Sequence, residues 1–98
     1  MTVDVPAQQA RIDGTPVHLT PIEFKLLYTL MVNAGKAMPK NELFVDVWGY
    51  EFIGGTNLVE VTVRRLREKV EPDPSNPTYI LTVRGMGYRF RAPDTNTP

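Results

Sequence analysis

The 98-residue sequence contains no cysteine, which excludes disulfide bonds and thiolate chemistry. It has no apolar run near the roughly 20 residues that a membrane-spanning helix needs. The first ten residues lack a basic segment followed by an apolar stretch, so they do not form a secretory signal. We therefore expect a single cytoplasmic domain that does not enter a membrane.

Catalytic clusters are missing as well. The only histidine is His18, which falls in a predicted strand beside no evident carboxylate. No spacing is typical of a metal site, a nucleophile elbow or a phosphate-binding loop. We predict that the protein is not an enzyme and uses no cofactor and no metal.

The sequence also carries no net charge, with 11 basic and 11 acidic residues. This balance argues against a protein that holds nucleic acid by overall charge alone. The basic residues of the second half are nevertheless clustered. One cluster comprises Arg64, Arg65, Arg67 and Lys69, and the other comprises Arg84, Arg89 and Arg91. Two short basic segments on a neutral body suit local, oriented contact with phosphates.

Turn and capping signals divide the chain into strands, three helices and a hairpin. Asp13-Gly14 between short β-rich runs predicts a hairpin in an N-terminal sheet. Thr20, Pro21 and Glu23 form a capping box with proline at the first helical position, which begins the first helix. Pro39 cannot cap the second helix with its side chain, so we expect that helix to begin without such a cap.

These elements predict an α+β fold. An N-terminal sheet is expected over about 2–19, followed by three helices over about 21–34, 40–47 and 57–70. A hairpin is expected over about 79–91, and a disordered tail over 92–98. The order corresponds to a winged helix-turn-helix, with an N-terminal antiparallel β-sheet, a three-helix core and a C-terminal β-hairpin wing. Residues 1–91 form one domain in this interpretation.

The third predicted helix has two different sides. At about 100° per residue, the core stripe comprises Val59, Val63, Leu66 and Val70. The opposite side comprises Asn57, Val61, Arg64, Arg65 and Glu68. A valine on a polar face can contact a thymine methyl in the major groove. The guanidinium group of an arginine can form two hydrogen bonds to a guanine edge or to a phosphate. The alternative interpretation is that this side of the helix is simply exposed to solvent, and that Val61 on it has no binding role.

The tip of the predicted hairpin reads Arg84-Gly85-Met86-Gly87. Its two glycines permit a tight turn beside an arginine. An arginine on a slender hairpin can enter the minor groove, where a narrow A·T-rich tract concentrates negative potential. The hairpin therefore favours DNA binding over a merely solvated helix face.

Four blocks of sequence resemble the C-terminal effector domain of the OmpR/PhoB family of bacterial response regulators. They are Leu19 to Leu27, Val47-Trp48-Gly49, Val61 to Lys69 and Thr82 to Phe90. The resemblance implies sequence-specific binding of double-stranded DNA in transcription regulation. The domain would then be the output domain of a two-component phosphorelay.

The resemblance also implies roles for single residues. Major-groove base contacts fall on Asn57, Leu58, Val61 and Arg65, and the minor-groove contact falls on Arg84. Phosphate contacts fall on Trp48, Thr62, Arg64, Arg67, Thr82 and Tyr88. A loop that in some members touches RNA polymerase contains Tyr50, Glu51, Phe52 and Ile53. Family members often carry histidine or tyrosine where Thr62 stands.

The resemblance further implies two copies bound head to tail on direct repeats, and a receiver domain in the full-length protein. No receiver fits before Leu19, so we expect either a piece of a longer regulator or a family member without a receiver. The alternative function is a winged-helix protein-interaction module that contacts RNA polymerase through its aromatic loop without reading DNA.

Overall fold

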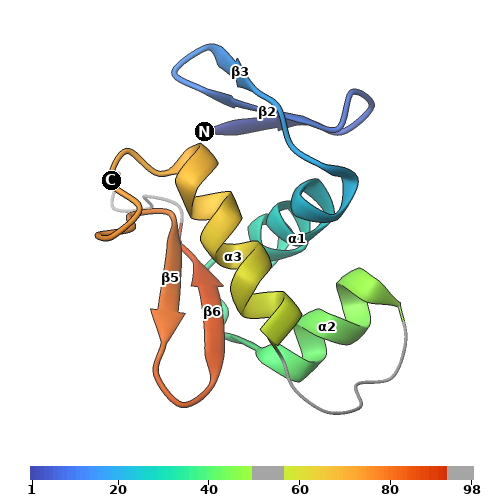
Figure 1. The fold of residues 1–98 in the computed structure, drawn as a ribbon, viewed down its shortest axis with the longest axis vertical. Coiled ribbons are helices and arrows are strands. Elements are labelled where there is room, and N and C mark those ends of the chain that lie inside the picture. Colours follow the sequence, from blue (N-terminus) through green and yellow to red (C-terminus); the bar gives the residue numbers. More distant parts are fainter. Residues whose placement is uncertain (50–56, 93–98) are drawn as a thin grey trace, which may run out of the picture.

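Two small antiparallel sheets and three helices make up the computed structural model, which describes residues 1–49 and 57–92 (Figure 1). The elements are β1 (Thr2–Asp4), β2 (Gln9–Ile12), β3 (Thr15–Val17), α1 (Pro21–Val32), β4 (Met38–Pro39), α2 (Lys40–Trp48), α3 (Asn57–Val70), β5 (Ile80–Val83) and β6 (Gly87–Phe90). The predicted fold class is confirmed. The predicted tail lies outside the described residues from residue 93 onward.

The N-terminal sheet has the strand order β1-β2-β3. Ile12 pairs with Thr15, so Asp13 and Gly14 alone form the connecting turn. Their φ angles of 51° and 81° are both positive, which a two-residue hairpin of the primed type requires. Thr15 and Pro16 already belong to β3.

Helix α1 begins with the predicted capping box. The Thr20 hydroxyl accepts from the Glu23 amide at 3.2 Å, and the Glu23 carboxylate accepts from the Thr20 amide at 3.0 Å. The helix ends at Val32, two residues before the predicted end. The Ala34 amide bonds to the carbonyl only three residues back, which closes a turn instead of extending the helix.

The core lies between the three helices and the inner faces of both sheets. Helix α3 buries Val59, Val63, Leu66 and Val70, as its predicted stripe requires. The other core residues include Leu26, Leu27 and Leu30 of α1, Leu43 and Val47 of α2, and Ile80 of β5. This packing leaves the opposite side of α3 exposed. No helix within the described ranges is long and apolar enough to cross a membrane.

The C-terminal hairpin is part of a three-stranded sheet in the order β4-β6-β5. The sequence did not predict β4, in which Met38 pairs with Tyr88 and Pro39 pairs with Gly87. Gly87 lies in β6 and not in the turn: a Cβ atom at this position would stand 2.0 Å from the Met38 carbonyl oxygen. The turn needs its positive φ at Gly85. One glycine therefore shapes the turn, and the other permits close approach of β4.

Candidate nucleic-acid interface

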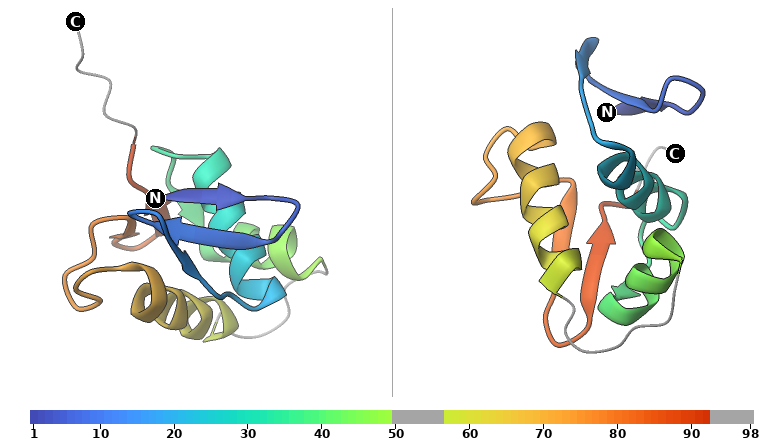
Figure 2. Two further views of the ribbon diagram at one scale, coloured as in Figure 1. Left: turned by 90° about the horizontal axis from the view of Figure 1, so that it is seen from above. Right: turned by 45° about the vertical axis from the view of Figure 1, so that its right-hand side comes forward.

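Helix α3 and the hairpin of β5 and β6, which we call the wing, lie next to each other in two views (Figure 1 and Figure 2). The N-terminal sheet lies at the opposite end of the molecule from the turn of the wing. The two elements that carry both basic clusters of the sequence thus form one side of the protein.

The exposed side of α3 carries the helix residues predicted to read bases, together with Arg64, a predicted phosphate contact. Asn57, Leu58, Arg64 and Arg65 are exposed, and Val61 is half-buried. Leu58 is 49% exposed, and an apolar side chain in that position suits contact with a base. Neither arginine forms an ion pair within the described part of the chain. Their guanidinium groups are available to an external anion.

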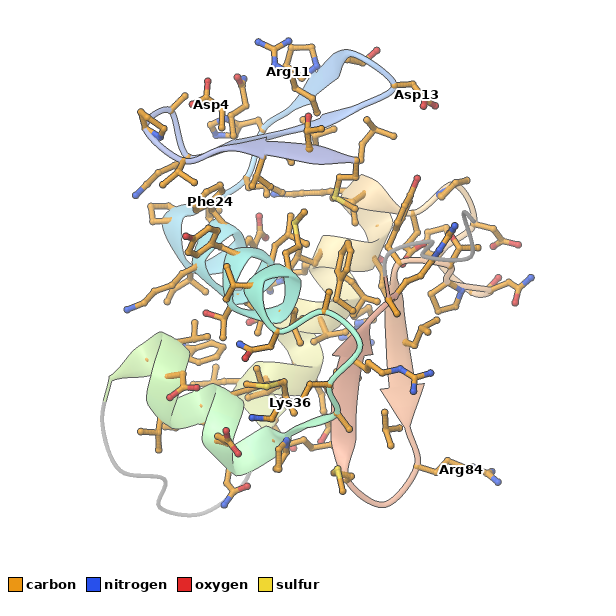
Figure 3. The ribbon with its side chains drawn as sticks, turned by 180° about the vertical axis from the view of Figure 1, so that it is seen from behind. Asp4, Arg11, Asp13, Phe24, Lys36 and Arg84 are labelled. Carbon is orange, nitrogen blue, oxygen red and sulfur yellow. The ribbon has the colours of Figure 1, made fainter. Side chains whose placement is uncertain are left out.

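Arg84 extends from the turn of the wing, away from the body of the molecule (Figure 3). Its neighbour Gly85 has a φ of 75°, which L side chains rarely adopt. Arg84 is exposed, as a residue that enters a groove must be. The structure therefore places a cation at the tip of a narrow hairpin beside the exposed side of α3.

Two predicted phosphate contacts, Thr62 and Trp48, are turned toward the protein, and a third, Tyr88, is only 7% exposed. Thr62 is only 7% exposed, and its hydroxyl donates to the Leu58 carbonyl at 2.7 Å. Trp48 is half-buried and stacks on Phe44, with ring centroids 5.3 Å apart and planes 11° apart. Neither side chain is exposed in the way that the side chain of Arg64 is.

Arg67 connects α3 to the wing. Its Nε and Nη2 atoms donate to the Ile80 carbonyl at 3.1 and 2.8 Å, and Nη2 also donates to the Thr82 hydroxyl at 2.9 Å. The guanidinium carbon lies 5.5 Å from the centre of the Tyr88 ring. Burial lowers the pKa of Arg67, and interactions with Tyr88 and Glu71 oppose this effect. The structure thus brings Arg67, Thr82 and Tyr88 together in one cluster.

Glu71 is a buried carboxylate that sequence reasoning missed. It accepts hydrogen bonds from the backbone amides of Thr78 at 2.8 Å, Tyr79 at 3.0 Å and Ile80 at 2.8 Å. It is 6% exposed. The only signal in the sequence was its position one helical turn after Arg67, which does not reveal burial.

Two hollows lie along the wing and share Thr82, one beside α3 and the other beside the start of α2, and we call them together the α3–wing cleft. The first is lined by Arg64, Arg67, Glu68, Pro74, Ser75, Pro77 and Thr82. The second is lined by Lys40, Thr82, Val83, Gly85, Met86, Gly87 and Tyr88. The cleft therefore holds three basic residues and one acidic residue. Lys40 was not among the predicted site residues.

The predicted polymerase-contact loop, with Tyr50, Glu51, Phe52 and Ile53, lies outside the described residues. Across residues 1–49 and 57–92, no three histidine, aspartate or glutamate side chains gather in a way that would bind a metal ion.

Comparison with known proteins identifies the family. Residues 14–90 match the family model described as transcriptional regulatory protein, C terminal. The chain is 46% identical over 91 residues to the DNA-binding response regulator MtrA of Mycobacterium tuberculosis. It is 44% identical over 91 residues to the transcriptional regulatory protein KdpE of the same species. These matches cover 93% of the chain, and the chain spans about 40% of the length of these relatives.

Solved structures agree with this assignment. The response regulator DrrB of Thermotoga maritima, an OmpR/PhoB homologue, superposes with a TM-score of 0.83 at 31% identity over 92% of this chain and 41% of that chain. The RstA DNA-binding domain of Klebsiella pneumoniae, solved in complex with the RstA box, also gives 0.83 at 31% identity, over 91% and 88% of the two chains. The chain therefore belongs to the C-terminal domains of OmpR/PhoB-family transcriptional regulatory proteins, which are regulators and not enzymes.

Proposed function

We propose that the chain binds double-stranded DNA in a sequence-specific manner, as the output domain of a two-component response regulator. The observation that carries this proposal is the set of exposed arginines on two adjacent elements: Arg64 and Arg65 on α3, and Arg84 on the wing. The similarity to the RstA domain, which was solved with its DNA box, supports it.

Helix α3 is the proposed major-groove element, because the major groove admits an α-helix. Asn57, Leu58, Val61 and Arg65 are the proposed base-contacting residues. Arg84 is proposed to enter the minor groove, where a narrow A·T tract attracts an arginine. The exposure of four of these residues supports the assignment, and Val61 is half-exposed on the same helix.

The α3–wing cleft is the proposed site of the DNA backbone. Arg64 lines the cleft and forms no ion pair with any residue that the structure describes, so its guanidinium group is available to a phosphate. Thr82 accepts from Arg67, so its own hydroxyl proton is free to be donated to a phosphate. Thr62 would have to give up its bond to the Leu58 carbonyl before it could donate to a phosphate. The proposed set of phosphate contacts is completed by Trp48, Thr62, Arg67 and Tyr88.

Replacing Arg65 by alanine tests the assignment of α3. Loss of a bidentate base contact costs about 1–3 kcal/mol and relaxes sequence preference at that position. Selection from a random pool of duplexes, for parent and variant, measures this directly. Arg11→Ala is the matched control, because Arg11 is an exposed arginine on the N-terminal sheet, far from Arg84 (Figure 3). An unchanged preference in Arg65→Ala would remove Arg65 from the base-reading set.

A salt titration tests DNA binding itself. If about four cationic side chains meet phosphates, log Kd should change with log salt with a slope of magnitude near 4. Binding to no duplex at low salt would contradict the proposal. It would favour the alternative of a protein-interaction module.

We also propose that two copies bind head to tail on direct repeats, and that the full-length protein contains a receiver domain. Two copies that read the same groove face must be offset by about one helical turn, or 10–11 base pairs. Inserting about five base pairs between the repeats places the second copy on the opposite face of the duplex. Cooperative binding should then be lost. Cooperative binding that survives the insertion would contradict the head-to-tail arrangement but not DNA binding.

A further inference from the structure

We propose that Lys40 is a further DNA-backbone-binding residue at the tip end of the α3–wing cleft, and that Glu60 competes with the phosphate for its ammonium group. This inference rests on the proposed function and names an additional contact within the same interface. Neither residue was indicated by the sequence.

Lys40 stands at the meeting point of α2, α3 and the wing. Its Nζ atom lies 3.2 Å from Oε1 of Glu60, near the start of α3. Its backbone amide bonds to the carbonyl of Met86 in the wing turn at 3.4 Å. Its side chain lines the same hollow as Thr82 and Tyr88, both of which are proposed backbone contacts. The Lys40 backbone is thus bonded to the wing turn, and its ammonium group is bonded to α3 through Glu60.

Four charged residues share one side of α3 and of the residue that follows it. They are Glu60, Arg64, Arg67 and Glu71, which recur at intervals of four, three and four residues. Arg67 and Glu71 bond to β5 near one end of the cleft, and Glu60 bonds to Lys40 near the other. A DNA strand that separates a major groove filled by α3 from a minor groove entered by Arg84 must cross this side. Lys40 lies on that path.

The existing ion pair is weak enough to be exchanged. The side chains of Lys40 and Glu60 are 37% and 46% exposed, so water and salt screen their attraction. A lysine ammonium has three donors, and a phosphate that binds one also releases condensed counterions from the duplex. The Glu60 carboxylate partly neutralises the positive charge of Lys40, and it also repels the phosphate. Removing that carboxylate should therefore strengthen DNA binding through Lys40.

A double-mutant cycle tests this coupling. The four proteins are the parent, Lys40→Gln, Glu60→Gln and the double variant. The probe is a duplex that the parent selects from a random pool, titrated over a range of salt concentrations. Lys36→Gln is the control, because Lys36 is an exposed lysine on the face seen from behind (Figure 3). Thermal unfolding of each protein shows that the variants are folded.

We expect Lys40→Gln to reduce the magnitude of the salt slope by about 0.9 and to weaken binding by up to about eightfold at 0.1 M salt. Lys40→Arg should restore both, even if Lys40→Gln unfolds. Glu60→Gln should tighten binding severalfold when residue 40 is lysine, and this gain should shrink in the double variant. Lys36→Gln should leave the slope unchanged.

Two results would overturn the inference. One is a salt slope in Lys40→Gln equal to that of Lys36→Gln. The other is a gain from Glu60→Gln that is the same with lysine or glutamine at residue 40, since Glu60 would then act only by general repulsion. These results can be distinguished from failure of the proposed function, because in that case the parent protein itself would bind no duplex.

Discussion

Arg67 and Glu71 hold opposite sides of the same backbone residue. The Arg67 guanidinium donates to the carbonyl of Ile80, and the Glu71 carboxylate accepts from its amide, both at 2.8 Å. Arg67 lies in the last turn of α3, Glu71 directly follows the helix, and Ile80 is the first residue of β5. The position of the wing therefore depends on the last turn of the proposed recognition helix.

Replacing Glu71 by glutamine should destabilise the domain by about 1–3 kcal/mol, because an amide nitrogen would face buried backbone donors that have no other acceptor in the cluster. Urea unfolding measures the loss, and hydrogen exchange should speed up at Thr78, Tyr79 and Ile80. Glu68→Gln is the control, since Glu68 is an exposed glutamate in the last turn of α3. Equal stabilities of the two variants would show that the Glu71 hydrogen bonds contribute little.

Gly87→Ala and Gly85→Ala should differ in severity. At Gly87 the new Cβ would lie 2.0 Å from the Met38 carbonyl oxygen, so β4 and β6 must separate, at a cost of about 3 kcal/mol or more. At Gly85 nothing lies within 4 Å, and the cost is the strain of a positive φ, about 1–2 kcal/mol. Thermal unfolding of both variants gives the comparison. A larger loss for Gly85→Ala would contradict the role assigned to Gly87.

The contact between Glu23 and Lys69 should make stability depend on acid pH. Burial raises the pKa of the Glu23 carboxyl, but the hydrogen bonds from Lys69 and Thr20 and the charge of Lys69 together lower it below its ordinary value of 4.5. The stabilisation is therefore complete above pH 4.5 and is lost as the pH falls through the lower pKa of the folded state.

Glu23→Gln isolates this effect, since glutamine preserves the capping box but not the charge. We expect it to lower the free energy of unfolding by about 1 kcal/mol near neutral pH, and the difference from the parent should vanish in acid. Unfolding curves over a pH series measure the difference. Asp46→Asn, at an exposed position on α2, is the control. A difference that stays constant with pH would exclude the ionised carboxylate as its source.

Arg84→Ala should weaken binding most where A·T pairs flank the major-groove site, because the narrow groove there holds the deepest negative potential. Titration against paired duplexes, with the flank changed from A·T to G·C, measures this preference. If both duplexes lose the same affinity, Arg84 is only a phosphate contact.

Local patterns predicted the elements whose determinants are close together in sequence. The capping box at Thr20, the turn at Asp13-Gly14 and the bounds of α3 each depend on neighbouring residues, and each was confirmed. Strand β4 was missed because Met38 pairs with Tyr88, far along the chain, and because proline argues against a strand.

The same distinction applies to the candidate site. Helical periodicity placed Arg64 and Arg65 on the side of α3 away from the core, where the structure has them exposed. It could not show that Arg67 binds β5, because a proline-rich loop separates the partners. Nor could it show that Lys40 and Glu60 meet, since they lie on different helices.

The two-residue strand β4 limits which DNA sites the domain can occupy. Because Met38 and Pro39 pair with β6 and lead directly into α2, the wing is joined to the helices at its inner edge as well as through Arg67. The fold then fixes the separation between α3 and the turn of the wing, and hence between the proposed base contacts of Arg65 and Arg84. One added base pair between the two contacted segments shifts the second by about 3.4 Å and turns it by about 34–36°. If Arg65 and Arg84 contact bases as proposed, we expect a site with the right bases at the wrong spacing to bind more weakly than one with the right spacing.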